Sequence, residues 1–117
     1  MMTDEAAPIL VVEDDPSLRL LCRVNLELEH FRVQEAASIV EARVRIETER
    51  PAVVFLDVFL AGEPTDALLE ELRAAGIPVV IVTGSDTAVY RDRADQVLGK
   101  PFAPADLVAA AKRYSVS

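Results

Sequence analysis

Three consecutive carboxylates follow the first apolar run of the sequence. Glu13, Asp14 and Asp15 come directly after ILVV at residues 9–12, where their like charges repel one another unless water or a cation separates them. Asp57 ends a second apolar run, AVVFLD. Several carboxylates around one point suit a hard divalent cation, and Mg²⁺ in particular prefers oxygen ligands. The alternative for the first cluster is structural, because acidic residues before a helix also serve as N-caps.

A hydroxyl and an ammonium group stand at the ends of two further apolar runs. Thr83 closes VVIVT, and Lys100 directly follows QVLG. A lysine and a hydroxyl beside a metal are suited to phosphoryl oxygens, whose transfer is assisted mainly by positioning and charge neutralisation. With Asp57 as the nucleophile, the product would be an aspartyl phosphate. Each residue alone is uninformative, so the prediction depends on the elements that bring them together.

Short apolar runs alternate with amphipathic stretches five times along the chain. The expected strands cover residues 9–12, 31–36, 52–57 and 78–84, with a fifth within 96–102, and a helical segment follows each of them. Repeated strand and helix units of this length predict an α/β fold with a doubly wound parallel sheet and helices on both faces. The carboxyl ends of all strands then lie along one edge, where such sheets bind ligands. The candidate residues are all predicted at that edge.

The first helix is expected to begin where the acidic cluster ends, because Asp15 and Pro16 form a good N-cap and N1 pair. Helical spacing predicts a side that packs on the sheet, made of Leu18, Leu21, Cys22, Asn25 and Leu28, with Arg19, Arg23, Glu27 and Glu29 in solvent. Cys22 is therefore interpreted as a packing residue rather than a reactive thiol.

Composition limits the classes of function. The chain has 117 residues, a formal net charge of −8 and a pI near 4.6, so we expect no surface for nucleic acid or for an anionic membrane. No apolar run approaches the roughly 20 residues of a membrane span, and the N-terminus lacks the basic and apolar regions of a signal peptide. We therefore expect a cytoplasmic protein with a single domain over residues 1–117 and a core at about 8–114.

At these residues the sequence resembles the receiver domain of two-component response regulators, over essentially the whole chain. The matching motifs are VVEDDPSLR, VVFLD, VVIVTG and GKPF, in family order. The resemblance implies a five-stranded sheet of flavodoxin-like order 2-1-3-4-5 and Asp57 as the phosphoacceptor. It also implies a Mg²⁺ site in which Asp14, Asp57 and the backbone carbonyl of Phe59 hold the ion directly and Glu13 acts through a water.

The resemblance also implies roles for the residues at the fourth and fifth strands. Thr83 would bind a phosphoryl oxygen and move inward on phosphorylation, and Lys100 would pair with Asp57 or with the phosphoryl group. The Lys100–Pro101 peptide would be cis. Gly84, which is small, would leave room for a phosphodonor to approach.

The sequence departs from the family pattern in three places. Ala61 stands where the family usually has a proline after the phosphoacceptor, and the loop around it is longer than usual. The segment from Thr83 to Lys100 is several residues shorter than is common, so we expect the fourth helix to be short or partly unwound. Val97 replaces the aromatic residue that often swings inward on activation. We therefore expect the signal to leave through the fourth-helix region or through the loop after the phosphoacceptor.

The function implied is that of a stand-alone receiver, a signalling protein rather than an enzyme and a monomer or weak dimer. It would accept a phosphoryl group from a histidine kinase or a histidine phosphotransfer protein, then bind an unknown downstream protein or act as a phosphate sink. Two alternatives stay open. A pseudo-receiver would bind a partner constitutively, and a small Mg²⁺-dependent phosphohydrolase would use Asp57 as its nucleophile. Such hydrolases usually carry an Asp general acid where Phe59 stands; Phe59 is expected instead to screen the acyl phosphate from water.

Overall fold

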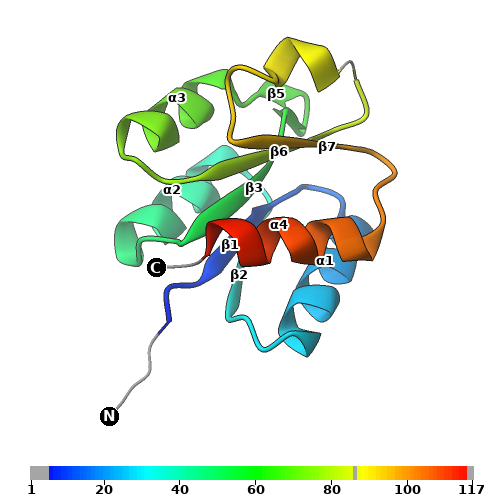
Figure 1. Ribbon diagram of the computed structural model, residues 1–117. Helices are drawn as coiled ribbons and strands as arrows, with labels where there is room; N and C mark the ends of the chain where they lie inside the picture. Colours follow the sequence, from blue (N-terminus) through cyan, green and yellow to red (C-terminus); the bar gives the residue numbers. More distant parts are fainter. Residues whose placement is uncertain (1–5, 86, 116–117) are drawn as a thin grey trace.

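The main sheet contains five strands, shown in Figure 1: β1 (Ile9–Val12), β2 (Val33–Ala36), β3 (Val53–Asp57), β6 (Val79–Thr83) and β7 (Gln96–Gly99). The structure is a computed structural model that describes residues 6–85 and 87–115. The strand order is β2-β1-β3-β6-β7, which confirms the predicted order 2-1-3-4-5. All neighbouring strands of this sheet pair in parallel, so their carboxyl ends share one edge.

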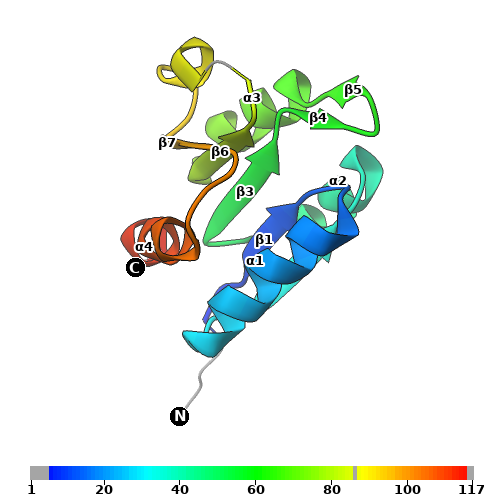
Figure 2. The ribbon, with the colours of Figure 1, turned by 90° about the vertical axis from the view of Figure 1, so that its right-hand side faces the viewer.

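Helices cover both faces of the sheet, as predicted. In the described part of the chain the α-helices are α1 (Pro16–Leu28), α2 (Ile39–Thr48), α3 (Asp66–Ala74) and α4 (Pro104–Tyr114). The buried side chains of α1 and α4 belong to one core cluster, and those of α2 and α3 belong to the other. Figure 2 shows the two pairs of helices on opposite sides of the central strands.

The two cores follow from the strand geometry, because alternate side chains of a strand point to opposite faces of the sheet. In β1, Ile9 and Val11 pack in the cluster of α1 and α4, whereas Leu10 and Val12 pack in the cluster of α2 and α3. None of these four is more than 1% exposed, and burial of each such side chain contributes roughly 1.5–3 kcal/mol. Strands that are apolar on both faces are typical of covered parallel sheets.

The start of α1 confirms the prediction for the third carboxylate. Asp15 has an extended backbone, and its side chain accepts a hydrogen bond from the Ser17 amide at 3.0 Å, with Pro16 at the first helical position. This cap satisfies one of the amides that a helix N-terminus leaves without a partner. Asp15 is thus used structurally, and the other two carboxylates of the cluster are left for a different role.

The predicted packing side of α1 is wrong in part. The buried residues of the helix are Cys22 and Leu26, whereas Leu21 is half exposed and Leu28 is 70% exposed. The helix is rotated relative to the prediction, because Leu26, which lies outside the predicted packing side, packs into the core. Burial also raises the pKa of the Cys22 thiol to about 12, which agrees with its interpretation as a packing residue.

Two arginines of α1 that were expected in solvent are half-buried instead. Arg19 and Arg23 both reach Glu35 of β2, at 3.2 and 2.7 Å. Arg19 also donates a hydrogen bond to the backbone carbonyl of Glu13 at 2.8 Å. The long aliphatic stems therefore lie along the protein while the guanidinium groups tie α1 to the end of β1 and to β2.

Among the described residues between β6 and β7, the fourth helix of the predicted pattern is reduced to a 3₁₀ turn, η1 (Thr87–Tyr90), which confirms the expectation of a short or unwound element. Arg93, which follows this turn, lies over the Tyr90 ring at 5.7 Å from the ring centroid. Its guanidinium also lies 3.2 Å from Asp66 and 3.9 Å from Glu70 of α3. Arg93 therefore links the short segment to α3, because its guanidinium contacts Tyr90 through a cation–π interaction and pairs with two carboxylates of α3.

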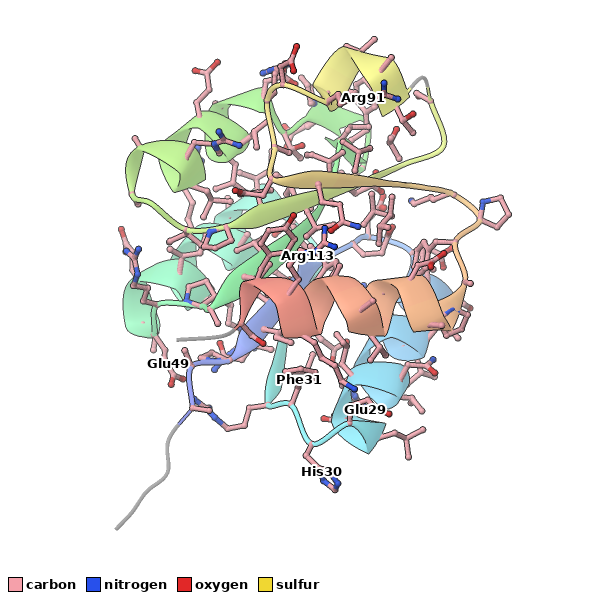
Figure 3. The ribbon with its side chains drawn as sticks, in the orientation of Figure 1. Glu29, His30, Phe31, Glu49, Arg91 and Arg113 are labelled. Atoms are coloured by element: carbon pink, nitrogen blue, oxygen red, sulfur yellow. The ribbon has the colours of Figure 1, made fainter. Side chains whose placement is uncertain are left out.

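The edge of the sheet opposite the candidate residues carries the single histidine of the sequence. His30 lies in the turn between α1 and β2 and, as Figure 3 shows, points away from the protein. Its φ of 70° places it in the left-handed region, and its amide donates to the Glu27 carbonyl at 2.9 Å.

In the part of the chain that the structure describes, none of the helices combines the length and the apolar character that a membrane span needs.

Candidate functional site

Four parallel strands bring the candidate residues to one edge of the sheet. Val12 of β1 pairs with Leu56 of β3, so Glu13 and Asp57, the next residues on each strand, stand side by side. Thr83 pairs with Gly99 at the end of the next two strands, and this pairing places Lys100 at the same edge. The convergence of these residues, predicted from strand order, is therefore present in the structure.

Lys100 lies between two of the carboxylates. Its Nζ atom is 3.1 Å from Oε1 of Glu13 and 3.1 Å from Oδ2 of Asp57. The Lys100–Pro101 peptide is cis, as the resemblance implied. Glu13 and Asp57 are buried, with 4% and 9% of their surface exposed, so the ammonium group offsets much of the repulsion between them.

Burial and charge shift the pKa values of these groups in opposing ways. Burial raises the pKa of Glu13 above its ordinary value, and the charge of Asp57 adds to this, although the Asp15 amide and Lys100 pull it down. Burial lowers the pKa of Lys100, but its hydrogen bonds to Asp57 and Glu13 outweigh burial and leave the pKa raised. The net shift of the Lys100 pKa therefore favours its charged form, whereas the net shift of the Glu13 pKa disfavours its charged form.

Three carboxylates form a cluster that suits a metal ion. One oxygen each of Glu13, Asp14 and Asp57 can be chosen so that all lie within 4.8 Å of one another. Asp14 is the exposed member of the cluster, and its pKa is lowered, chiefly because its carboxylate accepts a hydrogen bond from the Ala61 amide. An oxygen-only donor set with one solvent-facing member fits Mg²⁺, which keeps some of its waters when proteins bind it.

The hydroxyl at the end of β6 is buried next to this cluster. Thr83 is fully buried, its Oγ1 accepts a hydrogen bond from the Ser85 amide at 2.9 Å, and its carbonyl accepts one from the Lys100 amide at 2.7 Å. Val97, in place of the family's usual aromatic residue, is half-buried against the core on the α2 and α3 side. The hydroxyl thus has a local partner that it must leave if it moves toward Asp57.

The loop after Asp57 forms a small antiparallel hairpin that the sequence did not predict. Its strands are β4 (Phe59–Leu60) and β5 (Glu63–Pro64), and the two-residue turn between them has φ of 51° at Ala61 and 84° at Gly62. Positive φ at both central positions defines a type I′ turn, and for an L-residue such as alanine it costs roughly 1–2 kcal/mol. In Figure 2 the hairpin stands beyond the carboxyl end of β3.

A buried threonine fastens the base of this hairpin to the strand that carries Asp57. The Thr65 hydroxyl donates to the Asp57 carbonyl at 2.6 Å, and the Thr65 amide donates to the Val58 carbonyl at 3.0 Å. Thr65 stands at the N-cap position of α3 but makes no side-chain cap bond there, since its hydroxyl is used at Asp57. A threonine before Asp66 is a common sequence signal for the start of a helix. That signal predicts that the Thr65 hydroxyl caps α3, and it does not predict the contact with Asp57.

Removal of the Thr65 hydroxyl is expected to destabilise the protein. The variant Thr65→Val keeps the shape of the side chain but leaves a buried carbonyl without its donor, so the free energy of unfolding should fall by roughly 1–3 kcal/mol. Thr65→Ser keeps the hydroxyl donor, so its free energy of unfolding should fall clearly less. Urea unfolding of the three proteins measures the difference, and a loss in Thr65→Ser equal to or greater than that in Thr65→Val would contradict the dominant role given to the hydroxyl.

A doubly wound sheet of this order, with carboxylates, a buried threonine and a lysine at the carboxyl ends of its strands, defines a small α/β domain with a polar site at its topological switch point. The family model for the response regulator receiver domain matches residues 9–112. The chain therefore belongs to the response regulator receiver family. Receiver domains bind Mg²⁺ at an acidic pocket, and the carboxylate cluster of this chain is consistent with such a site.

Individual proteins show the same relationship. The chain is 35% identical over 107 residues to the DNA-binding response regulator MtrA of Mycolicibacterium smegmatis, covering 86% of this chain and 47% of that protein. The receiver domain of NtrX from Brucella abortus superposes with a TM-score of 0.84 at 30% identity, covering 92% of this chain and 97% of that one. A CheY-like receiver from Methanospirillum hungatei gives 0.85 at 27%, covering 95% and 94%. The chain spans about half the length of the curated relatives it matches.

Proposed function

We propose that the protein accepts a phosphoryl group on Asp57 from a histidine kinase or a histidine phosphotransfer protein, and so acts in two-component signalling. The observation that carries this proposal is the position of Lys100, whose Nζ lies 3.1 Å from both Glu13 and Asp57 inside the carboxylate cluster. A buried nucleophilic carboxylate beside a fixed cation and a metal-binding cluster suits phosphoryl transfer. The proposed domain extends over the whole chain, with its core at about residues 8–114.

The residues present fit a Mg²⁺ ion. In this proposal Asp14, Asp57 and the Phe59 carbonyl hold the ion directly and Glu13 holds it through a water, a set made only of the hard oxygen donors that Mg²⁺ prefers. When bound, the ion supplies positive charge that neutralises the phosphoryl oxygens during transfer. Phe59 begins the hairpin strand β4 directly beyond the end of β3, so its backbone is held next to the cluster.

The chemical step follows from the arrangement of the side chains. An oxygen of Asp57 attacks the phosphorus of a phosphohistidine, an O–P bond forms as the P–N bond breaks, and the departing imidazole takes up a proton. Lys100 balances the charge of the phosphoryl oxygens, and the Thr83 hydroxyl leaves the Ser85 amide to donate a hydrogen bond to one of them. Water later attacks the aspartyl phosphate and releases inorganic phosphate.

A groove beside Lys100 gives a phosphodonor protein access to the site. Its volume is about 570 Å³. The lining residues are Asp15, Ser17, Leu18, Leu21, Lys100, Pro101 and Phe102. Since most of the lining is apolar and Leu21 is exposed, the groove suits a phosphodonor protein that presents apolar side chains to it.

Incubation with Mg²⁺ and acetyl phosphate or phosphoramidate tests the proposal. Intact mass measurement of the wild type should show an adduct of about 80 Da, the mass of one phosphoryl group, and the Asp57→Ala variant should show none. An adduct of equal amount in the variant would place the phosphoryl group elsewhere. No adduct in either protein would reject phosphoacceptance and favour a pseudo-receiver that binds its partner constitutively.

The lifetime of the phosphorylated state is expected to depend on Phe59. Phe59 stands two residues after Asp57, where a polar side chain could hold the attacking water, and half of its surface is exposed. We expect slow autodephosphorylation in the wild type and a severalfold faster loss of phosphate in Phe59→Asn, because an amide can orient water and a phenyl ring cannot. Mass spectra taken over time after the donor is removed measure both rates. Equal rates would contradict screening by Phe59.

The altered segment between β6 and β7 is the proposed route of the signal. The Thr83 hydroxyl accepts a hydrogen bond from the amide of Ser85, which lies at the start of the connection to η1. At the other end of that connection, the Arg93 guanidinium donates a hydrogen bond to Asp66 of α3. We expect phosphorylation to change backbone chemical shifts from Ser85 to Arg93 and in the β4–β5 hairpin. NMR spectra before and after phosphorylation measure this, and shifts confined to β7 and α4 would contradict it.

A further inference from the structure

The turn of the β4–β5 hairpin points an amide at the metal cluster. The Ala61 N–H donates to Oδ2 of Asp14 at 2.9 Å, across 47 positions of sequence. The amide is aimed there because Ala61 takes a left-handed φ of 51°, which an L-residue adopts rarely and only where surrounding contacts hold it.

The hairpin that carries this amide is fixed at several points. Leu60, the residue before the turn, is buried with 1% of its surface exposed, and it pairs with Glu63 on the other strand. At the base, Thr65 bonds to the backbone carbonyls of Asp57 and Val58. The turn is therefore attached to the strand of the phosphoacceptor, and the amide has a defined position relative to the cluster.

Asp14 needs such a contact more than its neighbours in the cluster. Glu13 is fixed by Lys100 and by the Asp15 amide, and Asp57 is fixed by Lys100. Asp14 faces solvent, so its side chain would otherwise sample several rotamers. Because the Ala61 amide occupies Oδ2, the carboxylate is held in one orientation with Oδ1 left for a metal ion.

We propose that the Ala61 peptide N–H is a positioning group that holds Asp14 in its metal-binding orientation, so that the hairpin sets two parts of the metal site at once. One part is the Phe59 carbonyl and the other is the Asp14 carboxylate. This inference rests on the Mg²⁺ site of the proposed function. It assigns a role to the loop in which the chain departs from its family.

An amide-to-ester exchange tests the inference directly. Lactic acid in place of Ala61, introduced by nonsense suppression or chemical ligation, replaces the N–H by an oxygen and keeps the methyl group and the shape of the turn. Lactic acid in place of Ala37 is the matched control, because the Ala37 amide also donates to a carboxylate, that of Glu41 at 2.7 Å, but at the start of α2. Mg²⁺ affinity by calorimetry and Mn²⁺ affinity by electron paramagnetic resonance are measured on the full chain, with circular dichroism to show that each protein is folded.

The ester at 61 is expected to weaken Mg²⁺ binding about tenfold, the effect typical of losing an outer partner of a metal ligand, and the ester at 37 is expected to leave it unchanged. Ala61→Gly keeps the N–H, accepts the left-handed φ and should bind as the wild type does. Unchanged or tighter Mg²⁺ binding by the ester at 61, or an equal loss of Mg²⁺ affinity in Ala61→Gly, would overturn the role of the Ala61 N–H but not the metal site itself. Absence of Mg²⁺ binding by the unmodified chain would overturn the proposed metal site and the inference together.

Discussion

Replacement of Lys100 by methionine should lower the free energy of unfolding by roughly 2 kcal/mol at neutral pH and slow phosphorylation of Asp57 by at least about 100-fold. The variant leaves Glu13 and Asp57 side by side with no cation between them. Breaking a fully buried ion pair costs roughly 3–5 kcal/mol, and the smaller figure applies because the Lys100 side chain is 26% exposed and partly screened by solvent. Chemical unfolding and the rate of adduct formation measure the two effects.

The destabilisation should depend on pH in a defined way. Lys100 and Glu13 both have raised pKa values, and a group whose folded pKa is raised contributes stability below its ordinary pKa that is lost as the pH rises through the folded value. The difference between wild type and Lys100→Met should therefore shrink on acidification, as Glu13 takes up a proton, and again above the raised pKa of Lys100. It should be largest near neutral pH.

Mg²⁺ should stabilise the Lys100→Met variant more than the wild type. An ion that binds only the folded state raises the free energy of unfolding as its concentration rises, and in this variant it also replaces the missing positive charge. Lys112→Met is the matched control. Lys112 pairs with Glu29 at 3.0 Å on the surface, with 60% of its side chain exposed, so its loss should change stability by less than about 1 kcal/mol. Equal effects of the two substitutions would contradict the role given to Lys100.

Asp14→Asn should reduce Mg²⁺ affinity by about 100-fold or more, because it removes the charge of a direct ligand, and even outer partners of metal ligands are worth roughly 10- to 100-fold. The amide oxygen can still accept from the Ala61 N–H, so the hairpin keeps its contact. Calorimetric titration with Mg²⁺ measures the affinity. Phosphorylation from acetyl phosphate should fall in parallel, since the phosphoryl oxygens would lack a neutralising ion.

Asp15→Asn is the control, one residue along the chain and with the same change of charge. Asparagine caps helices as well as aspartate does, so the bond to the Ser17 amide and the stability of α1 should be kept. We expect Mg²⁺ affinity to fall only slightly, because the variant loses a negative charge near the site but no ligand of the ion. If the two variants lost affinity equally, Asp14 would act through overall charge and not as a ligand.

Much of the fold could be predicted because strand and helix signals agree along this sequence. The runs ILVV and VVIVT are too short and too apolar to be surface elements, and the alternation with helical segments leaves a covered parallel sheet as the arrangement. Once that sheet is assumed, Asp57, Thr83 and Lys100 must meet at one edge. The Asp15 cap could be predicted as well, because the signals for a helix start are local.

The features that could not be predicted depend on tertiary contacts. The hairpin after Asp57 has four strand residues and an alanine at a position that usually favours asparagine or glycine, so no local signal indicates it. The hydroxyl of Thr65 has a strong helix-cap signal, but a buried carbonyl competes for it. The rotation of α1 follows from the packing of Leu26, because several arrangements of its leucines satisfy the same helical spacing.

The proposed function requires that Asp57 takes the phosphoryl group with the help of the metal cluster. Borohydride reduction after incubation with acetyl phosphate can locate this group, since the reduction converts an aspartyl phosphate into homoserine, which peptide sequencing by mass spectrometry identifies. We predict homoserine at position 57 in the presence of Mg²⁺ and none when the ion is removed by chelation. Homoserine at Asp14 or another residue would rule out Asp57 as the phosphoacceptor, and the same yield at position 57 without Mg²⁺ would rule out the part given to the metal cluster.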